Sequence, residues 1–220
     1  MKKTSFNIAI DGLSGVGKSS IGYQVAKWLK FIFIDSGLFY RYIANRFYLD
    51  NTIQFNEIYY NKDEMISKQS YYLQEIEFAN LLLQENLQNE NRGYVVVGRN
   101  TTTKILPNAR VKLVLEADFE TRVYRKAKQL NAKEFDAIGK VFSDLLKHDM
   151  DSFDLVLVAK KVVTVINTSD LSIEQVVAKI LSCVLWIKFG DNNILYLIIF
   201  ILFVFVYNLH AHFSEKIQSN

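Results

Sequence analysis

Cysteine is almost absent from this chain of 220 residues, which contains a single one, Cys183. One cysteine excludes a disulfide within the chain and any metal site built from several thiolates. The opening residues, MKKTSFNIAIDG, have only a brief apolar run before Asp11. A secretory signal needs a longer apolar region and a small-residue cleavage site, so we expect none. Both features favour a cytoplasmic protein.

The chain also has little excess of either charge, because 26 basic residues are balanced by 23 acidic ones. The net charge of +3 comes without a basic stripe, so we expect no nucleic-acid partner. Half of the residues are hydrophobic, which is enough for a buried core at this length. The totals predict one domain of ordinary size, with or without a small insert.

Short apolar runs alternate with helical patterns along the chain. This alternation predicts an α/β fold in three layers, a five-stranded parallel sheet between helices, with right-handed crossovers. The expected strands are 6–10, 31–34, 94–97, 111–115 and 162–166. The expected helices are 19–29, 38–48, 64–87, 118–130, 135–148 and 172–185, and Ser172 with Gln175 forms a capping box at the start of the last one.

The segment IAIDGLSGVGKSS contains the clearest motif. Gly12, Gly17, Lys18 and Ser19 match G-x-x-x-x-G-K-[ST], between an expected strand and an expected helix. Glycines let the backbone turn its N–H groups toward an anion, and the helix N-terminus adds its dipole. Lys18 is expected to reach the β- and γ-phosphates, and the Ser19 hydroxyl to hold Mg²⁺. This motif predicts nucleotide binding and says nothing of the acceptor.

A second polar cluster follows the next expected strand. Asp35 stands at the strand end, where open α/β sheets place their ligands. Arg41 follows at helical spacing, and its planar guanidinium suits a phosphate. Other interpretations stay open for these residues: a helix cap for Asp35, core packing for Tyr40 and a solvated helix face for Arg41.

Three segments resemble the bacterial cytidylate kinase family. FIFIDSGLFYRYIA is similar to that family's DTGxxYR segment, and VVVGRNTTTKILPNARVKLVLEADFETR to its DGRDIGTVVLPDA segment. INTSDLSIEQVVAKIL resembles its closing strand and helix. The resemblance covers about residues 5–185. It implies a P-loop nucleoside monophosphate kinase with an acceptor-binding insert, here about 50–90, and a lid, here about 122–158. It also implies ATP with Mg²⁺ as donor and CMP or dCMP as acceptor.

The phosphate-loop motif, the resemblance and the neighbouring residues together give the expected site. The donor phosphates are held by Gly12, Leu13, Ser14, Gly15, Val16, Gly17, Lys18, Ser19 and Ser20. The acceptor is held by Asp35, Ser36, Tyr40, Arg41, Arg99 and Asn100. Ser19 and Asp35 hold the metal, and Arg122 and Arg125 help to close the lid. Lys18, Arg41, Arg99, Arg122 and Arg125 are expected to be the catalytic residues.

The sequence also departs from the family pattern. DGRD is replaced by VGRN at 97–100, and the lid motif RDxxDSTRE by KHDMDSFDLV at 147–156, so that His148 stands where an arginine is expected. A lost phosphate-clamping arginine can lower the rate by about 10³–10⁵-fold. Two alternatives therefore stay open: a P-loop kinase for another small acceptor, and a catalytically weak nucleotide-binding protein tethered by its C-terminal segment.

Residues 186–220 extend beyond the resemblance. Ile194 to Tyr207 is an uninterrupted apolar run, shorter than the roughly 17–25 residues of a membrane-spanning helix. Three hypotheses compete for it: an anchor that contacts a membrane through 194–213, a helix packed on the domain or on a second copy, and an extension without a role. We otherwise expect a monomer. His210 and His212 lack further ligands nearby and do not predict a metal site.

Overall fold

The computed structural model describes residues 6–38 and 93–189. The expected helices 38–48 and 64–87, the insert at 50–90 and the apolar segment 194–213 therefore lie outside the described residues, apart from Leu38. In chain order the described elements are β1 (Ile8–Asp11), α1 (Lys18–Leu29), β2 (Ile32–Asp35), β3 (Tyr94–Gly98), the π-helix η2 (Thr101–Ile105), β4 (Val111–Glu116), α4 (Phe119–Gln129), α5 (Phe135–Met150), α6 (Phe153–Lys160), β5 (Thr164–Asn167) and α7 (Ile173–Phe189).

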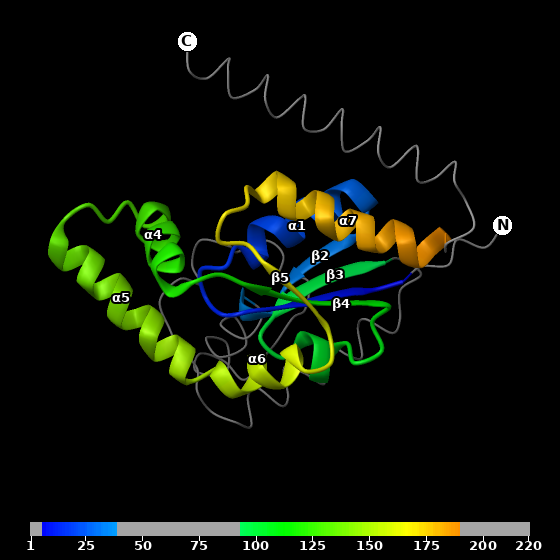
Figure 1. Ribbon diagram of the computed structural model, residues 1–220, viewed down its shortest axis with the longest axis horizontal. Helices are drawn as coiled ribbons and strands as arrows, with labels where there is room; N and C mark the ends of the chain where they lie inside the picture. Colours follow the sequence, from blue (N-terminus) through cyan, green and yellow to red (C-terminus); the bar gives the residue numbers. More distant parts are fainter. Residues whose placement is uncertain (1–5, 39–92, 190–220) are drawn as a thin grey trace, which may run out of the picture.

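The strands form one parallel sheet in the order β2-β3-β1-β4-β5 (Figure 1). The prediction of an α/β fold with five parallel strands is confirmed. Strand β1 lies at the centre, with Asp11 opposite Gly98 of β3 on one side and Val114 of β4 on the other. All carboxyl ends share one edge, so the residues that follow β1, β2 and β3 meet there.

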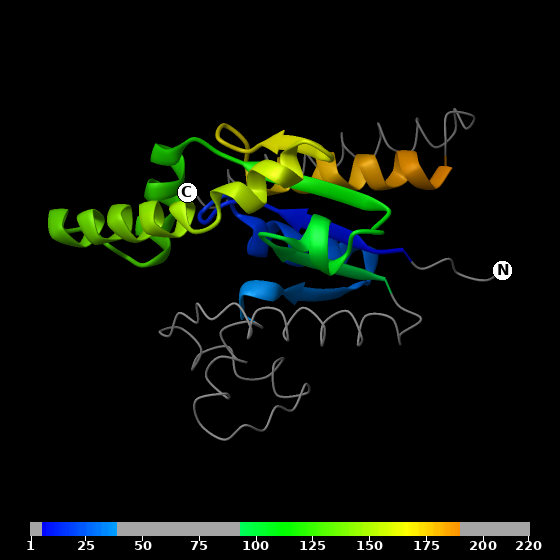
Figure 2. The same ribbon diagram turned by 90° about the horizontal axis from the view of Figure 1, so that it is seen from below.

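The central strands are buried because both faces of the sheet are covered. Every residue of β1 and β3 is buried, as continuous apolar runs require in a parallel sheet. Helices α1 and α7 pack on one face, while α6 and η2 lie against the other (Figures 1 and 2). The main core lies between the sheet and helices α1 and α7, and it includes Ile10, Val25, Leu113 and Ile180.

Helices α4 and α5 pack against each other and project from the carboxyl edge of the sheet, with their axes inclined to one another (Figure 1). Helix α4 begins after Asp118, whose carboxylate accepts a hydrogen bond from the backbone N–H of Thr121 at 2.8 Å. The pair has a small core of its own, made of Ala127, Val141 and Leu145. These two helices and α6 form most of the predicted lid.

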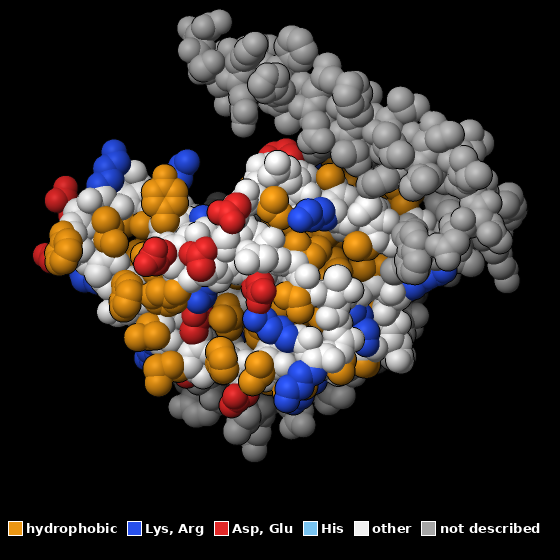
Figure 3. All heavy atoms as spheres, viewed as in Figure 1, with side chains coloured by type: hydrophobic (Ala, Val, Ile, Leu, Met, Phe, Trp, Pro, Cys, Tyr) orange, Lys and Arg blue, Asp and Glu red, His pale blue; other side chains and the backbone are white. Residues whose placement is uncertain are grey.

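Helices α5 and α6 also expose apolar side chains. Figure 3 shows them gathered over these two helices at the lower left of the molecule, and they include Phe135, Phe142, Leu146, Met150 and Phe153. Phe135 is 88% exposed. In the described ranges 6–38 and 93–189, no helix combines the length and the apolar character needed to cross a bilayer.

The structure differs from the sequence-based expectations in one strand and three helical segments. Strand β5 begins at Thr164 rather than Val162, which is 62% exposed and precedes the sheet. Helix α6 and the π-helix η2 were not predicted. Helix α7 continues to Phe189, four residues past the expected end at Leu185. The sequence of α6 is mostly apolar, although only Val156 and Ala159 are buried. Its apolar residues therefore do not recur at the spacing that marks one buried face of a helix.

Candidate active site

The phosphate loop connects β1 to α1 at the carboxyl edge of the sheet. Gly12, Gly15 and Gly17 all have positive φ, and Gly17 lies just before the first turn of α1. At Gly15, with φ +83°, a Cβ atom would lie 3.0 Å from both the Cβ and the backbone oxygen of Arg122. The loop can therefore lie against helix α4 only while residue 15 has no side chain.

Lys18 opens α1 and folds back over the loop, where its Nζ donates to the backbone oxygen of Leu13 at 2.7 Å. Burial lowers the pKa of Lys18 from its ordinary value of 10.5 to about 8. The guanidinium groups of Arg99 and Arg122 lower this pKa as well, while Asp35 and Asp11 oppose them. Three cationic side chains and two carboxylates thus lie close together beside the phosphate loop.

Ser19 and Asp35, the two residues expected to hold the metal, lie in direct contact. The Ser19 hydroxyl donates to Asp35 Oδ2 at 2.5 Å, while Asp35 Oδ1 accepts from the backbone N–H of Gly37 at 3.0 Å. The carboxylate therefore caps the turn after β2 and also faces the phosphate loop. A hydroxyl and a carboxylate are hard oxygen ligands, so the pair suits a small divalent cation.

Ser36 and Thr101 face the same point beside β3. A Cβ atom on Gly98 would lie 2.2 Å from Ser36 Oγ and 2.5 Å from Thr101 Oγ1. Both hydroxyls are buried, and within 6–38 and 93–189 neither has a hydrogen-bond partner. Asn100, next to Thr101, is also buried. The loop after β3 and the end of β2 therefore form a polar surface next to the phosphate loop.

Arg99 and Arg122 lie in contact with the lid helices. Arg99 Nη1 donates to Ser152 Oγ at 2.5 Å, at the junction of α5 and α6. Arg122 Nη1 lies 2.6 Å from Asp149 Oδ2 and donates to the backbone oxygen of Ser14 at 3.2 Å. Both side chains of the Arg122–Asp149 pair are largely buried, at 6% and 12% exposed. Arg122 thereby joins α5 to the phosphate loop.

Arg125 points to a different part of the site edge. Its guanidinium donates to the hydroxyl and backbone oxygen of Thr168, at 3.0 and 2.6 Å, and to the backbone oxygen of Ser169. The Thr168 hydroxyl in turn donates to the backbone oxygen of Glu116, with a longer contact to that of Val16. Arg125 therefore holds the turn after β5 against the phosphate loop.

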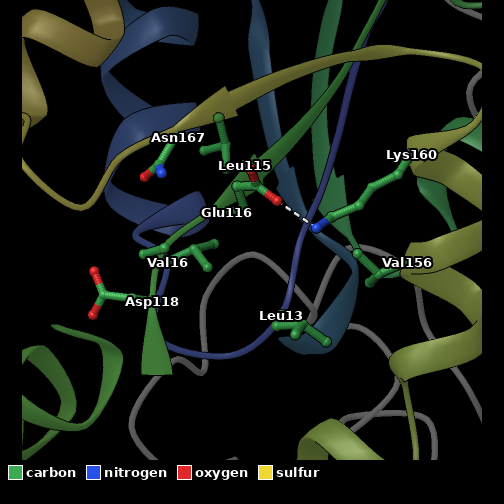
Figure 4. A pocket seen from close by; sticks show the side chains of 9 residues that line it. Leu13, Val16, Leu115, Glu116, Asp118, Val156, Lys160 and Asn167 are labelled. Atoms are coloured by element: carbon green, nitrogen blue, oxygen red, sulfur yellow. Dashed lines mark hydrogen bonds and ion pairs between the residues drawn. The ribbon is translucent and has the colours of Figure 1, made fainter. Parts of the chain in front are cut away.

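A cavity of about 280 Å³ lies beside the loop, on the side of α6. Leu13, Val156 and Asn167 are among the residues that line it, and Lys160 of α6 forms an ion pair there with Glu116 at the end of β4 (Figure 4). This pair joins the residue from which the chain leaves the sheet for α4 to the residue at which α6 ends.

The expected site residues within the described ranges all lie at this carboxyl edge. Ser20 belongs to the first turn of α1 and is exposed. Tyr40 and Arg41 lie outside the described residues. Four residues of the site were not predicted from the sequence: Asp11, Asp149, Ser152 and Thr168. No local motif marks these four polar residues. Asp11, Ser152 and Thr168 each bond to a residue that lies 43 or more positions away in the sequence, and Asp149 pairs with Arg122 on another helix.

A parallel sheet of this strand order with a glycine-rich loop after its central strand defines a P-loop kinase fold. The shikimate kinase of Acinetobacter baumannii, solved with shikimate, superposes with a TM-score of 0.51 at 19% identity, covering 86% of this chain and 97% of that one. A gluconokinase from Sinorhizobium meliloti has a TM-score of 0.51 at 15% identity, covering 81% and 91%. At such identities the similarity concerns the fold.

The chain belongs to the cytidylate kinase family. The family model described as cytidylate kinase matches residues 8–74 and 61–185. The cytidylate kinase of Mycoplasmopsis pulmonis is 32% identical over 217 aligned residues, which cover 82% of this chain and 96% of the relative. That of Mycoplasma capricolum is 30% identical, covering 77% and 91%. The resemblance stated from the sequence is thus confirmed.

Proposed function

We propose that this protein is a kinase that transfers the γ-phosphoryl group of ATP to CMP and dCMP. One observation of the site carries the proposal: Lys18 and Arg122 donate hydrogen bonds to the backbone oxygens of Leu13 and Ser14, so two cationic side chains lie directly against the phosphate loop. Phosphoryl transfer concentrates negative charge on the transferred group, and fixed cations stabilise that charge. The membership of the family supports cytidine monophosphates as the acceptors.

On the donor side, we propose that the backbone N–H groups of residues 12–20 and the ammonium of Lys18 bind the phosphates of ATP. The Lys18 ammonium donates to the backbone oxygen of Leu13, which is a neutral acceptor. A bound phosphate would be a stronger acceptor, since both partners would carry a charge. Arg122, on α4, would add its charge from the lid side.

Ser19 and Asp35 would hold Mg²⁺, Asp35 through a metal-bound water. Mg²⁺ retains several waters and takes one or two protein oxygens together with substrate phosphates, which fits this sparse pair of ligands. When bound, the cation neutralises charge on the β- and γ-phosphates.

On the acceptor side, Arg99 would bind the phosphate of CMP, with Asp35, Ser36 and Asn100 around the ribose and base. Tyr40 and Arg41 are proposed to complete this site. The lid, about 122–158, would exclude water so that ATP is not hydrolysed. The kinase domain would then span about 1–185, and we propose that it acts as a cytoplasmic monomer.

The test uses the full-length chain in mild detergent with MgATP. ADP formation is recorded with CMP, dCMP, UMP, AMP and GMP against a blank without acceptor, and Lys18→Ala identifies any contaminating kinase. We expect ADP formation with CMP and dCMP well above that with the other acceptors. ATP binding without any acceptor-dependent ADP would overturn the proposal.

A further inference from the structure

Asp11 is a fully buried carboxylate that the proposed chemistry leaves without a role. It is the last residue of β1, directly before Gly12, and has no exposed surface. A buried charge is costly unless it is well hydrogen-bonded. Its hydrogen-bond partners therefore show what the charge holds in place.

Asp11 accepts three hydrogen bonds, all from the segment that follows β3. Oδ1 accepts from the backbone N–H of Thr101 at 2.7 Å. Oδ2 accepts from the backbone N–H of Thr102 at 2.8 Å and from the Thr102 hydroxyl at 2.6 Å. These short, charge-assisted bonds fix the first two residues of η2 against the end of β1.

The segment held in this way carries the acceptor-site residues. Arg99 and Asn100 lie between Gly98, which is paired with Asp11 in the sheet, and Thr101. The loop is thus held at both of its ends relative to β1. Gly12, the first residue of the phosphate loop, directly follows Asp11 in the chain. Asp11 therefore fixes the loop that carries Arg99 and Asn100 relative to the phosphate loop.

We propose that Asp11 is a positioning residue that fixes Arg99 and the acceptor loop relative to the phosphate loop. This inference rests on the proposed function, because it assigns Arg99 to the acceptor phosphate. Near-attack geometry brings reacting atoms to about 3–3.5 Å, so a small shift of Arg99 would misplace the acceptor.

The carboxylate is required in this position, and asparagine cannot replace it. Each oxygen of Asp11 faces a backbone N–H, whereas an amide presents one oxygen and one N–H₂ group. Either orientation of an asparagine amide here would place a donor against a donor. Asp11→Asn is therefore a sharp test with little change of volume.

The experiment is a double-mutant cycle in the full-length protein with Asp11→Asn and Arg99→Ala. We expect Asp11→Asn to lower kcat/KM for CMP by about tenfold or more, mainly through the KM for CMP, with the KM for ATP changed by less than about threefold. In the Arg99→Ala background the same change should lower kcat/KM by less than about twofold, because residues that act through one another are not additive. Equal losses in both backgrounds, or parallel rises in both KM values, would overturn the proposal.

Two Thr102 variants test the same contact if Asp11→Asn does not fold. Thr102→Val removes one of the three hydrogen bonds and should raise the KM for CMP by a smaller factor, whereas Thr102→Ser keeps the hydroxyl and should behave as the unmodified protein. An unchanged KM for CMP in Thr102→Val, together with an unstable Asp11→Asn, would count against a positioning role.

A ligand-independent measurement separates this inference from the proposed function. Backbone hydrogen exchange at Thr101 and Thr102 should accelerate by about a hundredfold in Asp11→Asn and by a smaller factor in Thr102→Val, with exchange in β1 and β3 unchanged. Inactivity of the unmodified protein toward CMP would refute the proposed function alone, and accelerated exchange would still support the placement of the loop. Unchanged exchange at these two amides would refute the positioning role whatever the activity.

Discussion

Arg99 and Ser152 are joined by a 2.5 Å hydrogen bond that crosses 53 residues of sequence. Ser152 is buried, and its hydroxyl also donates to the backbone oxygen of His148, so its orientation is fixed by α5. The bond connects Arg99, which we propose binds the phosphate of the acceptor, to the junction of α5 and α6. Substrate binding and lid position should therefore influence each other.

Ser152→Ala is expected to weaken acceptor binding. The variant removes one partner of the Arg99 guanidinium, and a single hydrogen bond to a charged group contributes roughly 1.5–3 kcal/mol. We expect the low end of this range, a rise of about tenfold in the KM for CMP. Steady-state kinetics measure it. Ser182→Ala, at a partly exposed position of α7, is the control, and an equal effect of both variants would contradict the prediction.

Asp149→Ala is expected to destabilise the protein. It leaves Arg122 charged in a site where its side chain is 6% exposed, and removal of one partner of a buried ion pair costs about 3–5 kcal/mol. Urea denaturation followed by circular dichroism measures the change in the free energy of unfolding. Asp144→Ala, at an exposed position of the same helix, should stay within about 0.5 kcal/mol. A shift in Asp149→Ala as small as in this control would show that the pair is unimportant.

Lys18→Met is expected to stabilise the ligand-free protein while it abolishes ATP binding. Burial disfavours the charged ammonium in the folded state, as the pKa of about 8 reflects, and methionine removes that charge. We expect a gain of about 1–2 kcal/mol at neutral pH, seen as a higher melting temperature. A lower melting temperature would mean that the bond to Leu13 outweighs the burial of charge.

The same pKa predicts a pH dependence of stability. Between pH 8 and 10.5 the unfolded chain binds more protons at Lys18 than the folded protein does, so the free energy of unfolding rises with pH in this window. The advantage of Lys18→Met should therefore shrink as pH rises through 8 and vanish above 10.5. Melting curves of both proteins across this range measure it, and a constant difference would contradict the assigned pKa.

Gly98→Ala is expected to abolish acceptor binding and spare ATP binding. The new methyl group would lie 2.2 Å from Ser36 Oγ and 2.5 Å from Thr101 Oγ1, so the end of β2 or the start of η2 must move. Calorimetric titration with CMP and with ATP separates the two effects. Gly139→Ala, which meets nothing within 4 Å, is the matched control. Normal CMP binding by Gly98→Ala would show that this surface does not hold the acceptor.

The sheet and the phosphate loop could be predicted from the sequence because both are local patterns. Buried parallel strands are continuous apolar runs, and the loop's glycines and Lys18 follow one another in the chain. Strand β5 was predicted to begin too early and helix α6 was not predicted, since Val162 and most of the apolar residues of α6 are exposed. An apolar run indicates burial only where a partner surface exists.

The contacts among site residues could not be predicted in the same way. Arg122 was expected to help close the lid, and its partner Asp149 lies on another helix, within a motif that departs from the family pattern. Asp11 looked like a residue that ends a strand, and the pairing of β1 with β3 gives it the two amides it binds. Such roles arise from topology rather than from spacing along the chain.

The ion pair between Glu116 and Lys160 has a consequence for how this enzyme could be redesigned. It fastens the point where the chain leaves the sheet for α4 to the point where α6 ends. The segment between them contacts the rest of the site through Arg122, Arg125 and Ser152, which bond to the phosphate loop, to the turn after β5 and to Arg99. A chimaera could therefore receive the lid of a relative as one segment, provided that it keeps Glu116, Lys160 and these three side chains.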